Sequence, residues 1–403
     1  MKKVLNISYS LFTISVLCSN YNLYAQDSIV TAIAKQNVSL FVPDNNSFTG
    51  IGWTNLIEKA KECNDVLIGE DHFTNEIPYF TSALASQIKF DNFFCEIDPF
   101  TASILQGKIK NLQENELQEY VHKYGNTFSF YAFDPEFALL KQLSKSNVTI
   151  MGTDQILLIG DRVICSELQK ITKNKKAEKI YLTIQNNSKT YFENFLKDQS
   201  KPFYLLTDDF AKRLEELQLL QLSPYEIKII NALKLSVNIY KSQRNHLRIQ
   251  LMKNQLMENY TDWSGKKNLF KYGANHVAKG EGLLEVYDIG NLVYNIDDSA
   301  YKKSLHIMIL GSSGTQASPF EGYPEEKIDE NNSILKTLKP ITSMVSGNQW
   351  HCFNMLPLRQ ALREGKVIIN DIRLLRIVKG YDFVIIIPKV TASKIAAGTA
   401  SFH

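Results

Sequence analysis

The sequence is short of cysteine and of net charge, and each shortage excludes a class of function. Its 403 residues include five cysteines. No two of them form a CxxC pair, which excludes a zinc knuckle and a thioredoxin-like motif. The 45 basic and 42 acidic residues leave a formal net charge of +3, too little for a surface built to hold phosphate backbones. We therefore expect no nucleic-acid partner and no dedicated binding to anionic membrane surfaces.

Several catalytic signatures are also missing. The chain has no P-loop and no GxGxxG motif, which argues against nucleotide chemistry. It contains neither HExxH nor HxH, and the strand-like run that ends at 310–314 lacks the GxSxG elbow of a serine hydrolase. The function must therefore be sought in residues that are scattered along the chain.

The first 26 residues have the pattern of a secretory signal peptide. Lys2 and Lys3 precede a modestly apolar run over 4–17, and Ala25 supplies a small residue at its exit. We expect cleavage beside Ala25 or Gln26, and an exported protein that is periplasmic or secreted.

A lipid anchor and a retained membrane anchor are the alternatives at this segment. Cys18 would carry the lipid, but Val16 and Leu17 before it are not the small residues that a lipoprotein signal usually needs, so lipid anchoring is not expected. No later stretch approaches about 18 uninterrupted apolar residues, so we expect no stable membrane insertion after signal removal. The disulfide state of the remaining cysteines stays open: Cys63, Cys95, Cys165 and Cys352.

Short apolar runs alternate with segments of helical periodicity along much of the chain. Six runs have the length and apolar character of buried strands: 65–69, 92–97, 147–152, 269–272, 306–310 and 383–387. Helical spacing of apolar residues is found between the first three, at 75–89, 99–111, 113–124 and 135–145. This alternation predicts an α/β fold with a mostly parallel central sheet and helices on both of its faces.

The texture changes over residues 156–262, where Lys-, Glu-, Leu- and Gln-rich helical patterns follow one another. We interpret this part as a large all-helical insertion or cap of four or five helices. The predicted organisation is a signal peptide at 1–26, the first part of an α/β catalytic core at 27–155, the helical insertion at 156–262, and the second part of the core with a C-terminal segment at 263–403.

Polar residues follow four of the predicted strands at the point where each strand ends. The first strand leads into Glu70 and His72, and the second leads into Glu96 and Asp98. The third leads into Asp154, and the first strand after the helical block leads into Asn275 and His276. Because ligands of parallel α/β sheets bind beyond the carboxyl ends of strands, these ends predict one shared cleft.

Two chemistries fit such a set of residues. A histidine beside a carboxylate is the usual general-base pair, and Glu70 and His72 are two residues apart. Together with Glu96 and His276 they could instead ligate a divalent metal ion, and both readings remain open. For the other five of the seven histidines we expect a surface or packing role: His122, His246, His306, His351 and His403.

The motifs around these residues resemble those of the erythromycin esterase family. The resemblance is carried by 66–72 with Glu70 and His72, by 94–98 with Glu96, and by 147–155 with its Gly-x-Asp end. It extends to Arg248 and Met252, four residues apart on the last helix of the insertion, and to 272–276. The relatives of that family include the ChaN-like haem-binding lipoproteins and the TraB/Tiki proteins. The resemblance covers about residues 50–300.

The resemblance implies a catalytic set made of Glu70, His72, Glu96, Arg248 and His276. In that family a first-motif histidine activates water for attack on a lactone carbonyl, which implies this role for His72 with support from Glu70. It implies that Arg248 and His276 complete the pocket, and an arginine there suits a developing oxyanion or a carboxylate. We assign substrate contacts to Asp98, Asp154 and Asn275.

Two departures from the family pattern put macrolide hydrolysis in doubt. The esterases separate the first-motif Glu and His by two residues, whereas only Asp71 intervenes here, as in the ChaN-like proteins. The esterases also often carry a histidine three residues before the later one, where this chain has Gly273. No particular substrate follows from the sequence.

The leading hypothesis is an exported hydrolase in which water, activated by His72, attacks an ester, lactone or amide carbonyl of a small molecule. The first alternative is a ChaN-like uptake protein that binds haem or a metal ion. The second is a degenerate family member without catalysis. The sequence makes no prediction of the oligomeric state.

Overall fold

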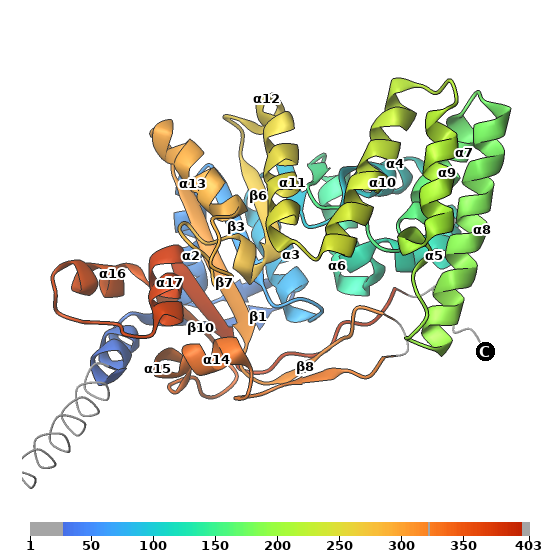
Figure 1. The fold of residues 1–403 in the computed structure, drawn as a ribbon. Coiled ribbons are helices and arrows are strands. Elements are labelled where there is room, and N and C mark those ends of the chain that lie inside the picture. Colours follow the sequence, from blue (N-terminus) through green and yellow to red (C-terminus); the bar gives the residue numbers. More distant parts are fainter. Residues whose placement is uncertain (1–26, 321–322, 397–403) are drawn as a thin grey trace, which may run out of the picture.

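A nine-stranded sheet forms the centre of the protein (Figure 1). The computed structural model describes residues 27–320 and 323–396. In spatial order, the strands of this sheet are β2 (Ser47–Thr49), β1 (Val38–Asp44), β10 (Trp350–Asn354), β11 (Phe383–Ile387), β7 (Ser304–Gly311), β3 (Asp65–Glu70), β6 (Asn268–Gly273), β4 (Asn92–Cys95) and β5 (Thr149–Gly152). Two further strands, β8 (Gly314–Gln316) and β9 (Glu326–Ile328), form a separate pair.

The predicted mostly parallel sheet is confirmed. All neighbouring strands from β11 through β7, β3, β6 and β4 to β5 are parallel. The sequence did not predict β1, β2 and β10, which add an antiparallel edge. These strands lack a long apolar run, since β10 contains His351 and Asn354 and most of β1 is only half-buried.

Helices cover both faces of the sheet, and alternate residues of each strand therefore belong to different cores. Val66, Ile68 and Phe93 lie in one buried cluster, whereas Leu67 and Phe94 lie in the other. The helices of the first cluster include α2 (Ile51–Glu62), α3 (Glu76–Gln87), α4 (Pro99–Asn111), α5 (Glu114–Tyr124) and α6 (Asp134–Lys145). Those of the second include α13 (Ile289–Ser299), α16 (Leu356–Arg363) and α17 (Ile372–Gly380).

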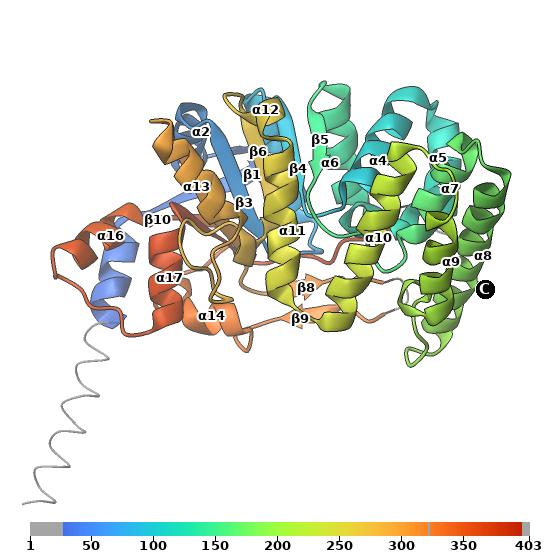
Figure 2. The same ribbon diagram turned by 45° about the horizontal axis from the view of Figure 1, so that its top comes forward.

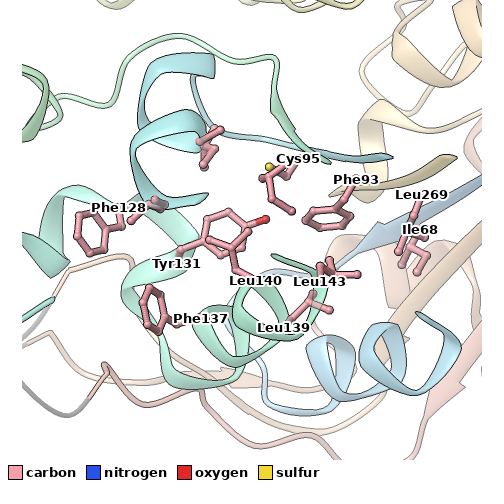
Figure 3. Packing of buried hydrophobic residues seen from close by; sticks show 14 of the residues in the cluster. Ile68, Phe93, Cys95, Phe128, Tyr131, Phe137, Leu139, Leu140, Leu143 and Leu269 are labelled. Carbon is pink, nitrogen blue, oxygen red and sulfur yellow. The ribbon is translucent and has the colours of Figure 1, made fainter. Parts of the chain in front are cut away.

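Figure 3 shows part of the first cluster at close range, where β4 meets the helices that follow it. Phe93 and Cys95 of β4 point toward Tyr131, and Leu140 and Leu143 of α6 lie beside them. All five side chains are at most 2% exposed. β4 is therefore held tightly by packing up to its last residue, directly before Glu96.

The chain between β5 and β6 is helical, as predicted. It forms α7 (Asp161–Ile171), α8 (Lys175–Lys197), α9 (Asp208–Gln218), α10 (Pro224–Ser242), α11 (Asn245–Glu258) and the short α12 (Tyr260–Trp263). Helices α7 to α10 lie beyond the β5 edge of the sheet (Figure 2). α11 differs from them, because Met252 and Leu256 pack in the second core together with Phe94 and Phe270. The boundaries between the structural units stay a prediction.

The four cysteines of the described residues are free and buried. They are Cys63, Cys95, Cys165 and Cys352. None of the helices within the described ranges is long and apolar enough to cross a bilayer. The predicted signal peptide, with Cys18 and its cleavage site, lies outside the described residues.

A substitution at Gly152, the last residue of β5, tests how closely the strand ends are packed. An added Cβ there would lie 2.5 Å from the backbone oxygens of both Ile97 and Asp98. We expect Gly152→Ala to lower the free energy of unfolding by about 1–3 kcal/mol, the usual cost of overpacking. Equilibrium denaturation in urea measures the change.

Gly107 provides the matched control, because it lies within α4 and an added Cβ would meet nothing within 4 Å. Gly107→Ala should raise the stability by about 0.4–1 kcal/mol, because alanine restricts the unfolded chain and favours the helix. Equal effects of the two substitutions would contradict the packing described for β5.

Candidate functional site

The carboxyl ends of four adjacent parallel strands bring the predicted site residues together. The strands β3, β6, β4 and β5 are neighbours in that order. Glu70 ends β3, His276 follows β6, Glu96 follows β4, and Asp154 follows β5. β4 ends at Cys95, two residues earlier than predicted, so Glu96 has already left the sheet. The shared rim that the sequence predicted is thus present.

Glu70 and His72 form a hydrogen-bonded pair. The distance between His72 Nδ1 and Glu70 Oε1 is 2.9 Å. A neutral His72 would donate its Nδ1 proton to the carboxylate and keep a free lone pair on Nε2. The ring stacks on Phe130 at 4.4 Å between centroids, and 26% of the His72 side chain is exposed. The pair therefore has a fixed ring, a fixed tautomer and access from solvent.

The pKa of His72 is raised above its ordinary value of 6.5. Burial acts to lower this pKa, but the hydrogen bond to Glu70 and the negative charges of Glu96 and Glu70 outweigh the effect of burial. Nε2 of His72 lies 3.7 Å from Glu96 Oε2. The side chain is consequently a stronger base than a free histidine.

Glu96 lies at the centre of the cluster. Its Oε1 accepts a hydrogen bond from Arg248 Nη2 at 2.6 Å, and its Oε2 accepts one from the backbone N–H of Gly273 at 2.7 Å. His276 Nε2 is 3.5 Å from Oε1. Burial opposes ionisation, yet His276 and Arg248 bring the pKa of Glu96 well below its usual range. Glu96 is therefore ionised, and both histidines face the same carboxylate.

Arg248 links the helical segment to the rim of the sheet. Its Nε donates to Asp154 Oδ1 at 2.9 Å and its Nη2 donates to Asp154 Oδ2 at 2.5 Å. Met252, one turn further along α11, is fully buried in the second core and fixes the helix. Within the described ranges Arg248 Nη1 has no hydrogen-bond partner, so this donor remains free for a ligand.

Two carboxylates favour the protonated form of His276. Its Nδ1 lies 2.7 Å from Asp288 Oδ2, and Asp288 is itself fixed as the N-cap of α13. Burial opposes protonation, but Glu96 and Asp288 raise the pKa of His276 to about 10. A protonated His276 can donate a hydrogen bond or stabilise negative charge, but it cannot act as a base near neutral pH.

Lys271 was not predicted from the sequence as a site residue; it lies within β6 with its side chain 3% exposed. Its Nζ lies 2.7 Å from Glu70 Oε1 and 2.6 Å from Glu136 Oε1. Burial alone would raise the pKa of Glu70, but Lys271 and His72 bring it below its usual value. Burial raises the pKa of Glu136 to about 7 despite Lys271. The available signal was a lysine in the middle of an otherwise apolar strand.

The three predicted substrate contacts have different surroundings. Asp98 caps α4, where its Oδ1 accepts hydrogen bonds from the backbone N–H groups of Phe100 and Thr101 at 3.0 and 2.8 Å. Asp154 holds Arg248, as described above. The Asn275 side chain forms no hydrogen bond within the described part of the chain and does not line the cavity beside the cluster.

That cavity has a volume of about 140 Å³. It lies beside Glu96 and Arg248 and is lined mostly by polar residues: Glu96, Ile97, Asp98, Thr101, Thr127, Ser129, Phe130, Asp154, Gln155, Leu157, Tyr240 and Arg248. Phe130 belongs to both the cavity wall and the stack with His72. A group bound in the cavity would therefore lie next to the Glu70–His72 pair.

The four metal-ligand candidates do not fit a divalent ion. Glu70 and Glu96 are already paired with Lys271 and Arg248, and both ring nitrogens of His276 are turned toward carboxylates, those of Asp288 and Glu96. No group of three or more His, Cys, Asp or Glu side chains suited to a metal ion is found in the residues described. The arrangement suits acid–base chemistry on a small molecule.

The other described histidines agree with the packing and surface roles that we expected. His306 is buried in β7 and contacts the backbone oxygen of Val277 and the hydroxyl of Ser304. Burial lowers the pKa of His306 to about 4. His351 is also buried, and His122 and His246 are exposed on helices. His403 lies outside the described residues.

Replacing Lys271 by methionine should destabilise the protein strongly. Lys271→Met leaves Glu70 and Glu136 buried without a cation, and losing one partner of a buried ion pair costs about 3–5 kcal/mol. Lys271 lowers the folded-state pKa of Glu70, so its stabilisation is present above the unfolded-state pKa and is lost as pH falls through the folded-state value. The deficit should therefore be largest near neutral pH and shrink in acid, as measured by urea denaturation.

Lys108→Met is the control, because the pair between Lys108 and Glu167 is about a quarter exposed on both sides. Its loss should cost about 0–1 kcal/mol. A pH-independent deficit for Lys271→Met, or one no larger than that of the control, would contradict the charge pairing described for the site.

Comparison with known proteins reveals the fold but no sequence family. No protein-family model matches the chain, and no curated protein matches its sequence. A succinoglycan biosynthesis protein of solved structure aligns with a TM-score of 0.55 and 15% identity, over 92% of this chain and 99% of its own. Erythromycin esterase EreC, solved in an open conformation, aligns with a TM-score of 0.54 and 11% identity, over 85% of this chain and 94% of its own.

The haem-binding ChaN of Campylobacter jejuni aligns more weakly, with a TM-score of 0.29, 16% identity and coverage of 68% of this chain and 91% of its own. The similarity to ChaN is too weak to relate the two proteins' sites. The stronger alignments span most of the chain, and at these identities they concern the backbone arrangement. The protein therefore has the erythromycin esterase-like fold.

Proposed function

We propose that this protein is a hydrolase that cleaves an ester, lactone or amide of a small molecule, with His72 as the general base. The observation that carries the proposal is the Glu70–His72 pair, whose Nε2 has no hydrogen-bond partner among the described residues and lies 3.7 Å from ionised Glu96. A lone carboxylate–histidine contact could be structural, but this one lies beside a polar cavity and partly in solvent.

The pair would activate water through a fixed tautomer. Glu70 accepts a hydrogen bond from the Nδ1–H of His72, so Nε2 takes a proton from water and the carboxylate stabilises the resulting imidazolium. Lys271 keeps Glu70 ionised for this role. A water molecule beside both His72 Nε2 and Glu96 Oε2 could donate one hydrogen bond to each and direct its oxygen toward a carbonyl carbon.

The remaining steps use Arg248, His276 and the proton held by His72. Attack would form a tetrahedral oxyanion, which the free Nη1 of Arg248 and the protonated His276 are suited to stabilise. His72 would then return its proton to the leaving oxygen or nitrogen. One water is consumed, the carbonyl carbon keeps the hydroxyl, and an alcohol or amine leaves. No redox step is involved.

The fold shared with erythromycin esterase EreC supports ester chemistry, but it does not extend to the macrolide substrate. A Cβ at position 273 would lie 2.8 Å from His72 Nε2, so a larger residue there would displace the His72 ring. The haem-binding alternative stays a prediction, because no contact of the described residues favours it.

His72→Ala should abolish most of the turnover of activated esters. Loss of a general base typically lowers the rate about 10²–10⁴-fold, and we expect kcat/KM for p-nitrophenyl acetate and a small lactone to fall within that range. The control is His122→Ala, which removes an exposed histidine of α5. Unchanged turnover in His72→Ala, with the fold intact by circular dichroism, would rule out His72 as the base.

The pH dependence of kcat/KM should report the raised pKa of His72. The base acts only when neutral, so activity should fall as pH drops, with a midpoint above the ordinary histidine value of 6.5. Glu70→Gln removes charge that raises this pKa and should move the midpoint to lower pH. Glu167→Gln, which alters a carboxylate on α7, should leave the midpoint in place. A midpoint that is the same in wild type and Glu70→Gln would mean that another group limits the rate.

A further inference from the structure

We propose that a groove between α16 and α17 binds an anionic amphiphile, a free fatty-acid carboxylate whose alkyl chain lies on an apolar floor and whose charge lies beside Arg363 and Lys379. The groove is at the opposite end of the protein from helices α7 to α10 (Figure 2). None of the residues of the candidate functional site lines it, so the inference does not depend on the proposed hydrolase function.

The floor and walls of the groove are aliphatic. Val367 and Ile369 are 2% and 7% exposed, and Ile368 between them is 59% exposed. Leu362 and Leu375 are half-buried against the second core. All five side chains line the same groove. Exposed apolar surface that is gathered in a concave place, rather than scattered, indicates a site for a hydrophobic group.

The charged residues of the groove are basic. Arg359, Arg363 and Lys379 line it, and none of the described residues that line it is acidic. The guanidinium of Arg359 is already bound to Asp382 and to the backbone oxygen of Val378. Arg363 and Lys379 are exposed and form no ion pair within the described part of the chain. Two such cations beside an apolar floor fit one anionic group at the end of an alkyl chain.

The cations lie next to the apolar walls on the two helices. Arg363 directly follows Leu362 in α16, and Lys379 follows Leu375 by four residues in α17. Residues four apart on a helix are neighbours on its surface, so Lys379 borders the wall that Leu375 forms. The head group of a bound amphiphile can therefore contact the cations while its chain stays on the floor.

The size of the groove favours a single small molecule. Its volume of about 560 Å³ lies within the range of roughly 300–1,000 Å³ that is usual for small-molecule sites. Eight residues line it, whereas a stable protein interface uses about 20–30 residues on each side. A lipid bilayer presents a broad surface and would leave a concave groove unfilled. A cationic amphiphile would be repelled by Arg363 and Lys379.

The test is isothermal titration calorimetry of the wild-type protein with laurate, octanoate and dodecyltrimethylammonium, each below its micelle concentration. Laurate should bind at least about tenfold more tightly than octanoate, since each fully buried CH₂ group is worth about fourfold in affinity and the groove is open on one side. It should also bind at least about tenfold more tightly than dodecyltrimethylammonium, which has the opposite charge. Equal affinity for laurate and dodecyltrimethylammonium, or binding of neither, would overturn the inference.

A substitution at Ile368 tests the apolar floor. Ile368→Asn should weaken laurate binding about fivefold or more, and the protein should stay folded because this side chain is 59% exposed. The matched control is Ile372→Asn, since Ile372 is 53% exposed on α17 but does not line the groove. Equal losses in the two variants would mean that laurate coats exposed apolar surface without a defined site, which would overturn the inference.

The cations are tested by a double substitution. Arg363→Gln with Lys379→Gln should weaken laurate binding about three- to tenfold and remove its advantage over dodecyltrimethylammonium. Lys366→Gln is the control, because Lys366 is exposed between the same helices but does not line the groove. An unchanged preference for laurate in the double variant would overturn the role of the cations.

Vesicles of phosphatidylglycerol distinguish a free carboxylate from a lipid surface. Wild type should bind laurate and should not sediment with these vesicles. Sedimentation with vesicles that Ile368→Asn abolishes, without heat on addition of laurate, would overturn the inference and identify the groove as a membrane contact.

Discussion

One electrostatic constraint governs the site: the carboxylates buried at the rim of the sheet must share a small number of cations. Glu70 and Glu136 share Lys271, and Glu96 and Asp154 share Arg248. An unpaired buried carboxylate would take up a proton rather than remain charged. The pairing therefore keeps Glu70 and Glu96 ionised on either side of His72, and it is this pair of negative charges that makes the imidazole a better base.

The two cations come from different structural elements, and the helical segment between β5 and β6 supplies one of them. Lys271 comes from the central strand β6, which is fixed by pairing on both sides. Arg248 comes from α11, where Met252 is four residues further along and thus on the same helix face. Burial of Met252 in the second core holds the helix at the height at which Arg248 meets Asp154 and Glu96. At this rim the charge pairing of Arg248 therefore depends on the packing of α11.

The sequence predicted the features that depend on local pattern and missed those that depend on tertiary partners. Continuous apolar runs identified the parallel strands, and their ends identified Glu70, His72, Glu96, Asp154 and His276. Lys271 and Asp288 were missed because their roles depend on residues far away in the chain. Asn275 was expected to contact the substrate because it follows a strand. The short helical turn Ala274–His276 directs adjacent side chains in different directions, and within this turn it is His276 that faces Glu96. Which residue of a turn points into a site is decided by backbone geometry that apolar spacing does not encode.

In the proposed hydrolase, the position of His72 separates the general base from the cavity that would select the substrate. The ring stacks on Phe130, its Nε2 lies in the space that Gly273 leaves open, and its Nδ1 is hydrogen-bonded to Glu70. With its ring fixed in this way, a general base at His72 would act on any carbonyl within its reach. In the proposed hydrolase, discrimination between substrates would then come from the neighbouring cavity, whose wall is formed mostly by polar residues. Because a polar group left without a partner on binding costs about 1–3 kcal/mol, a substrate group that hydrogen-bonds to this wall would gain affinity and orientation at once.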